Sequence, residues 1–103
     1  MRLKVGVKLT DLQPQMVLAA MIVQEVYRER GGKATITSAN DGTHGTLSLH
    51  YKGMALDLRT KDFEGNKQAL VLEIKDRLGE DFDVILEDEG KPNEHLHCEY
   101  DPK

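Results

Sequence analysis

The sequence predicts an α+β domain in which two helices pack on one face of a small, mainly antiparallel sheet. Two stretches repeat apolar residues at the spacing of a helix, and several shorter stretches alternate between polar and apolar residues as strands do. Turn residues separate these stretches, and the 103 residues contain no internal repeat, low-complexity tract or linker. A chain of this length is expected to form one domain over residues 1–103.

The N-terminal half is expected to form a strand, a long helix and a second strand. Residues 3–9 alternate between apolar and polar side chains, which is the pattern of a half-buried strand. A helix is expected over 11–30, because Pro14 falls in its first turn and Gly31-Gly32 ends it. The apolar stripe of this helix consists of Leu12, Met16, Ala20, Val23 and Tyr27. Residues 33–38 are expected to form the next strand.

The C-terminal half is expected to add further strands and the second helix. Polar and apolar residues alternate over 46–51 and again over 54–58, and strands are also expected over 82–86 and 94–100. The second helix is expected over 66–78, and Gly79 closes it. Acidic residues gather between 81 and 89, where we expect solvated turns.

Composition excludes several classes of protein. With 39% hydrophobic residues, two Phe, three Tyr and no Trp, the chain is expected to bury one modest aliphatic core. The net charge of −4 and the scattered basic residues argue against a nucleic-acid partner. Cys98 is the only cysteine, so no intramolecular disulfide forms. No apolar run approaches the roughly 20 residues that span a bilayer. The N-terminus lacks signal-peptide features, so we expect synthesis in the cytoplasm.

Residues 48–57 (SLHYKGMALD) set a histidine and an aspartate near a flexible point of the chain. If 54–59 is a strand, its side chains alternate between a core face, with Met54, Leu56 and Leu58, and an open face, with Ala55, Asp57 and Arg59. Beside Ala55, the carboxylate of Asp57 is expected to lie in a local hollow. Gly53 allows the chain to bend back, so His50 and Asp57 can converge on one point.

The final strand repeats this pattern of an open polar face. His95, His97 and Glu99 share one face, while Leu96, Cys98 and Tyr100 share the core face. Histidine and aspartate are ordinary zinc ligands, and three protein ligands with one open position are typical of catalytic zinc. Glu94 supplies a carboxylate that can accept a proton from water, provided that a bend at Pro92 and Asn93 turns it toward His97.

Two motifs in this part of the chain resemble those of a known family. Ser48, His50, Gly53, Ala55 and Asp57 match the pattern Ser-x-His-x-x-Gly-x-Ala-x-Asp of the D-alanyl-D-alanine carboxypeptidase and L-alanyl-D-glutamate endopeptidase family. Residues 94–97 (EHLH) match its second motif, Glu-or-Asp-x-x-His, in the right order. The chain therefore resembles zinc peptidases that cut peptidoglycan peptides and share a fold with the hedgehog signalling domain. A hedgehog/DD-peptidase-like fold is the implied architecture.

The resemblance implies a zinc ion as cofactor and a role for each matched residue. His50, Asp57 and His97 would be the zinc ligands. Glu94 would be the general base and would also protonate the leaving amine. His95 would border the metal and stabilise the tetrahedral oxyanion.

Three further residues are expected at the edge of the site. Arg59 shares a face with Asp57, which suggests either a partner for that ligand or a contact to a substrate carboxylate. Ser48 and His44 are expected to bind substrate. Residues 37–41 lack the arginine that many members carry, so the residue that recognises a substrate carboxylate is left open.

The expected function is zinc-dependent hydrolysis of an amide bond in peptidoglycan peptides, by an endopeptidase or a carboxypeptidase. The resemblance suggests a phage-type lysin or prophage product that a separate partner releases to the cell wall. Two alternatives stand beside it. One is a cytoplasmic D,D-dipeptidase or muropeptide peptidase, and the other is a non-catalytic, zinc-stabilised binding module. The scissile bond and the oligomeric state stay open.

Overall fold

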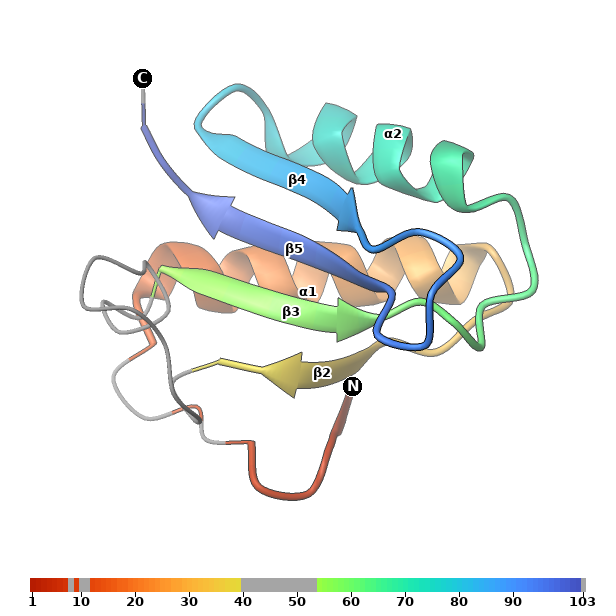
Figure 1. Cartoon of the computed structure of the whole chain (residues 1–103). Coiled ribbons are helices and arrows are strands. Elements are labelled where there is room, and N and C mark those ends of the chain that lie inside the picture. Colours follow the sequence, from red (N-terminus) through yellow and green to blue (C-terminus); the bar gives the residue numbers. More distant parts are fainter. Residues whose placement is uncertain (8, 10–11, 40–53, 103) are drawn as a thin grey trace.

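The expected α+β architecture is confirmed. The computed structural model describes residues 1–7, 9, 12–39 and 54–102. Within these described residues, five strands form one sheet in the order β1-β2-β3-β5-β4 (Figure 1). They are β1 (Arg2–Leu3), β2 (Thr35–Ser38), β3 (Ala55–Arg59), β4 (Phe82–Glu87) and β5 (His95–Tyr100). Strand β1 runs parallel to β2, and every other neighbouring pair is antiparallel.

Two helices, α1 (Pro14–Glu29) and α2 (Lys67–Leu78), enclose the core against the sheet. Helix α1 runs behind β3 and β5, and α2 lies beside α1 and next to β4 (Figure 1). The core joins buried residues of both helices to the inward side chains of the central strands, among them Leu56, Leu58, Leu96 and Cys98. Neither helix is long and apolar enough to cross a lipid bilayer.

Helix α2 has the limits that its sequence predicts, because local signals fix both ends. Asn66 is the N-cap, and its side-chain oxygen accepts a hydrogen bond from the backbone N–H of Ala69 at 3.0 Å. Gly79 follows the helix with a φ of 87°, a conformation that glycine adopts without strain. Leu70, Val71 and Ile74 form its buried side.

The first strand and first helix are shorter than predicted. Strand β1 covers only Arg2–Leu3, because the chain turns at residues 4–7, where the N–H of Val7 donates to the carbonyl of Lys4 and Gly6 has a φ of 92°. Val5 consequently lies 99% exposed. Helix α1 starts at Pro14 and ends at Glu29, inside the predicted limits.

Alternation in β3 places the core side chains correctly, with one correction. Leu56 and Leu58 are buried, and Asp57 and Arg59 are half-buried on the opposite face, as expected. Ala55 does not border an open hollow, because its side chain is also fully buried. The predicted turn at 40–42 and the alternating stretch 46–51 lie outside the described residues.

In the loop after β3, the buried ring of Phe63 packs between Gly32 and Gly65. The ring of Phe63 is 7% exposed and meets Tyr27 edge-on, with ring centroids 5.7 Å apart. A Cβ atom added at Gly32 would lie 2.8 Å from Phe63 Cδ1, and one added at Gly65 would lie 2.8 Å from Cε2. The Phe63 ring is therefore in close contact with both glycines, and a shift of the ring away from one of them would bring it closer to the other.

We expect Gly32→Ala and Gly65→Ala each to lower the free energy of unfolding by about 1–3 kcal/mol, the usual cost of overpacking. Denaturant unfolding of the two variants measures this loss, with Glu64→Ala on the exposed surface of the same loop as the control. Unchanged unfolding midpoints in both glycine variants would contradict the tight packing of Phe63 against the two glycines.

Candidate metal centre

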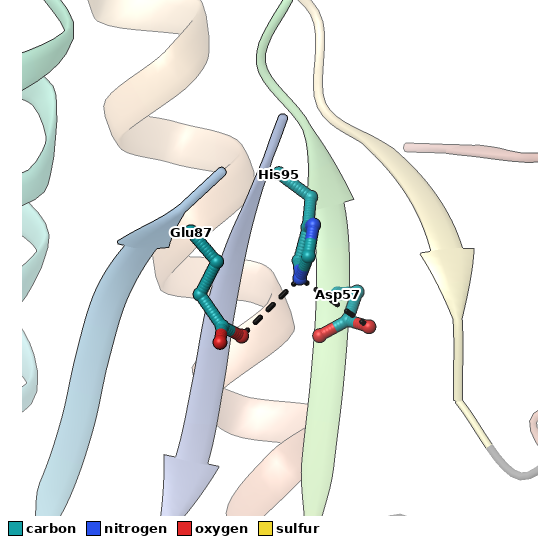
Figure 2. Close-up of side chains that lie close together, drawn as sticks. All are labelled: Asp57, Glu87 and His95. Carbon is teal, nitrogen blue, oxygen red and sulfur yellow. Dashed lines mark hydrogen bonds and ion pairs between the residues drawn. The ribbon is translucent and has the colours of Figure 1, made fainter. Parts of the chain in front are cut away.

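Four titratable side chains gather on the open face of the sheet, opposite the helices. Antiparallel pairing sets Asp57 of β3 directly across from His97 of β5, and His95 of β5 directly across from Glu87 of β4. Residues that face one another in an antiparallel pair carry their side chains on the same side. In Figure 2, Asp57, Glu87 and His95 point toward one another from three adjacent strands.

Each histidine of this cluster lies between carboxylates. The Nδ1 atom of His97 is 2.7 Å from Asp57 Oδ1, and its Nε2 atom is 3.1 Å from Glu99 Oε1. The Nε2 atom of His95 is 3.2 Å from Glu87 Oε1 and 4.0 Å from Asp57 Oδ2. The Nδ1 atom of His95 lies 2.8 Å from the carbonyl oxygen of Asn93. Backbone and carboxylate oxygens therefore fix the orientation of both rings.

These contacts raise the pKa of both histidines. For His97, the hydrogen bond to Asp57 is the largest cause and outweighs the opposing effect of burial. For His95, burial lowers the pKa, but the Asn93 carbonyl and the charges of Asp57 and Glu87 together raise it. A metal ion competes with protons for these nitrogens, because only the neutral imidazole is a ligand.

We expect zinc affinity to fall as the pH drops, beginning above pH 6.5, the ordinary histidine pKa. The sign follows from the raised pKa values, since the protonated rings stabilise the metal-free fold below pH 6.5. This stabilisation disappears as the pH rises through the raised values. Zinc titrations between about pH 5 and 8.5 measure the effect. An affinity that is constant over this range would contradict it.

The donor set of Asp57, Glu87 and His95 can hold a metal ion, and its geometry can be compared with that of zinc sites. Donor atoms of Asp57, Glu87 and His95 all lie within 4.8 Å of one another, and all three side chains are half-buried. Ligand atoms about 2.1 Å from one tetrahedral zinc ion are about 3.4 Å apart. The separations of 3.2 and 4.0 Å from His95 Nε2 bracket that value, so small rotations of the side chains suffice. One imidazole and two carboxylates are donors that zinc accepts.

The predicted ligands are only partly within the described structure. Asp57 belongs to the cluster, and His97 is hydrogen-bonded to it. His50 lies outside the described residues, as do Ser48 and His44. The tripod of His50, Asp57 and His97 therefore stays a prediction. His95, which was expected to border the metal and stabilise the oxyanion, itself contributes a donor atom to the cluster, and its expected role stays a prediction.

Glu94 is engaged elsewhere. Its carboxylate accepts hydrogen bonds from Thr60 Oγ1 at 2.7 Å, from Lys67 Nζ at 2.6 Å and from the backbone N–H of Gly90 at 2.9 Å. Burial opposes ionisation, but these donors prevail and lower its pKa to about 2. Because a carboxylate with so low a pKa is a weak proton acceptor, this environment does not favour the predicted role of general base.

Glu87 is the carboxylate that sequence reasoning missed. We expected the strand over 82–86 to be followed by a solvated turn from Glu87, but β4 extends through Glu87, and its register brings that side chain to His95. The sequence did contain a signal for this position. If the alternation of the strand continues past residue 86, Glu87 lies on the same face as Asp83 and Ile85. Identifying its neighbour also required the pairing of β4 with β5.

Beside the cluster lies a groove of about 230 Å³ with several cationic residues. Lys4, Arg59 and Lys61 contribute to its lining, together with Asp57 and His95. The Nη1 atom of Arg59 is 3.9 Å from the carboxylate of Asp62, a long contact at a half-exposed side chain. The expected role of Arg59 toward Asp57 or a substrate carboxylate stays a prediction.

Comparison with known proteins points to one group. Over 58 residues the chain is 38% identical to the Indian hedgehog B protein of Danio rerio, covering 56% of this chain and 13% of that protein. Over 83 residues it is 30% identical to the Indian hedgehog protein of Gallus gallus, covering 79% of this chain and 19% of that protein. The chain resembles part of the hedgehog proteins. No family model matches the chain.

This similarity is weak and agrees with the hedgehog/DD-peptidase type of fold that the two motifs implied. The observed α+β sheet with two helices is of the same class. The chain spans less than a fifth of the length of either hedgehog relative. The similarity therefore supports a relation in fold, whereas the candidate metal site rests on the side-chain cluster alone.

Proposed function

We propose that this domain is a zinc-dependent hydrolase that cleaves an amide bond in peptidoglycan peptides. The observation that carries the proposal is the convergence of Asp57, Glu87, His95 and His97 on one open face of the sheet. The set combines nitrogen and oxygen donors with an additional carboxylate, as metal-dependent hydrolysis requires. The motif resemblance to peptidoglycan peptidases supplies the substrate class.

Exposure favours different roles for the two carboxylates. The side chain of Asp57 is 18% exposed and is held by His97, whereas that of Glu87 is 44% exposed. We therefore assign Asp57 to the metal. As nitrogen donors we take His97 and His50, which the motif resemblance implies, so that Glu87 and His95 of the observed cluster remain for proton transfer and charge stabilisation. Glu87 is assigned to proton transfer, because a more exposed carboxylate can rotate toward a substrate and a water molecule.

The chain's own residues then account for the proton movements of amide hydrolysis. Glu87 accepts a proton from the attacking water and delivers it to the leaving amine as the carbon–nitrogen bond breaks. When Glu87 turns toward the attacking water, the Nε2–H of His95 that contacts it is released and can donate toward the oxygen that becomes negative when water adds to the carbonyl carbon, while Nδ1 stays on the Asn93 carbonyl. A bound zinc ion supplies Lewis acidity toward the carbonyl and toward water. The cationic groove with Lys4, Arg59 and Lys61 is suited to an acidic peptide.

The hedgehog similarity favours a second candidate, a metal-stabilised binding module without catalysis. Zinc content by mass spectrometry, combined with cleavage of purified muropeptides, separates the two functions. Stoichiometric zinc with release of a new amine supports the peptidase. Stoichiometric zinc without cleavage of any wall peptide supports the binding module, and the absence of zinc binding at neutral pH would reject both.

A further inference from the structure

The turn between β4 and β5 carries the candidate site at its two ends. Glu87 is the last residue of β4, and His95 is the first residue of β5. Within the turn, the N–H of Lys91 donates to the carbonyl of Asp88, and the N–H of Glu94 donates to the carbonyl of Lys91, each at 3.0 Å. The conformation of this turn therefore sets how Glu87 and His95 face one another.

The turn contains strained backbone that needs external support. Asp88 has a φ of 53° and Gly90 a φ of 80°, and the former is costly for a residue other than glycine. The side-chain amide of Asn93 donates to the Asp88 carboxylate at 3.0 Å on the exposed side. On the buried side, the carboxylate of Glu94 accepts the backbone N–H of Gly90 at 2.9 Å.

Glu94 also ties this turn to two other elements. Its Oε1 atom accepts from Thr60 Oγ1, directly after β3, and from Lys67 Nζ, at the start of α2. The side chain of Glu94 is 3% exposed and that of Lys67 is 25% exposed. Removing either partner leaves the other charge largely buried without its counter-charge, which is costly.

We propose that Glu94 is a positioning residue. Its buried carboxylate holds the β4–β5 turn against β3 and α2 through hydrogen bonds to Thr60, Lys67 and Gly90. In this way Glu94 orients His95 relative to Glu87 and Asp57. His95 is the sensitive member of the cluster, because its Nδ1 atom contacts the carbonyl oxygen of Asn93 within the turn. His97 lies farther along β5, and its hydrogen bonds go to Asp57 and Glu99 outside the turn, with only a longer contact of 3.8 Å to Glu87. The importance for catalysis rests on the proposed function, whereas the orientation of His95 does not.

Three variants test whether the Glu94 carboxylate holds the turn in place. Glu94→Gln removes the charge and places an amide N–H₂ among three donors, and Lys67→Met removes the main counter-charge. Lys67→Arg keeps the charge and should rescue the ion pair, so it also guards against a general loss of folding. Gln68→Ala is the matched control, since Gln68 joins α2 to the same turn through the exposed Glu89.

The first measurement uses the metal-free protein. We expect Glu94→Gln and Lys67→Met to shift and broaden the imidazole NMR signals of His95 while the signals of His97 persist. Lys67→Arg and Gln68→Ala should resemble the unmodified protein. Unchanged His95 signals in both Glu94→Gln and Lys67→Met would overturn the proposal. This result does not depend on whether the protein binds zinc or cleaves peptides.

The second measurement is the rate of peptide cleavage by the zinc-loaded protein. Because His95 is assigned to the developing oxyanion and the assigned zinc ligands lie outside the turn, we expect Glu94→Gln and Lys67→Met to lower this rate by about 10²- to 10³-fold, the cost of losing one oxyanion donor, while zinc affinity stays nearly unchanged. A different result would identify Glu94 as the general base and reject the positioning role. In that case Glu94→Gln would abolish hydrolysis while zinc affinity and the His95 signals stayed unchanged, and Lys67→Met would remain active.

Discussion

Glu87→Gln is expected to lower the rate of amide hydrolysis by about 10²- to 10⁴-fold, the usual contribution of a general base. The amide has nearly the shape of the carboxylate but cannot accept the proton of water at neutral pH. Because Asp57 and the histidines are retained, the variant should still bind zinc. Rates of muropeptide cleavage and zinc titrations with the same preparation measure the two effects.

Glu89→Gln provides the control for this experiment. Glu89 is an exposed acid in the turn after β4 and accepts from Gln68, away from the cluster. We expect it to keep the full rate. Full activity of Glu87→Gln would reject Glu87 as the base, whereas loss of activity together with loss of bound zinc would identify Glu87 as a metal ligand. Comparison with Glu94→Gln then assigns the base to one of the two glutamates.

Asp57→Asn is expected to lower zinc affinity by at least about 100-fold, more than the usual loss from residues outside the ligand set. Asp57 is the carboxylate shared by the predicted tripod and the observed cluster, and it contacts both His97 and His95. Loss of its charge should also lower the pKa of His97, because the hydrogen bond that His97 donates to Asp57 is the largest cause of the raised value.

Zinc titration and NMR titration of the His97 imidazole measure these two consequences of Asp57→Asn. Asp62→Asn is the matched control, since Asp62 follows β3 and its nearest ionic partner is Arg59 at 3.9 Å. Undiminished zinc binding by Asp57→Asn would remove Asp57 from the metal site. An unchanged His97 pKa would contradict the electrostatic account of the cluster.

The amino-acid sequence by itself determined the elements with strong local signals. Helix α2 has its predicted limits because the Asn66 cap and Gly79 act within a single turn of chain. Alternation separated Leu96 and Cys98, which are buried, from His95 and His97, which lie on the open face. These features depend on residues a few positions apart, so the sequence pattern was sufficient.

Only the tertiary structure decided which carboxylate stands in the cluster. Glu94 precedes His95 in the chain, but its charge pairs with Lys67, which comes from another element. Glu87 is farther along the sequence from His95, yet the β4–β5 register makes the two direct neighbours. Register and ion pairing depend on contacts between distant segments, and a spacing motif such as Glu-x-x-His cannot encode them. For the same reason, the sequence pattern placed Asp57, His95 and His97 on the open faces of their strands but could not identify Glu87 as their neighbour.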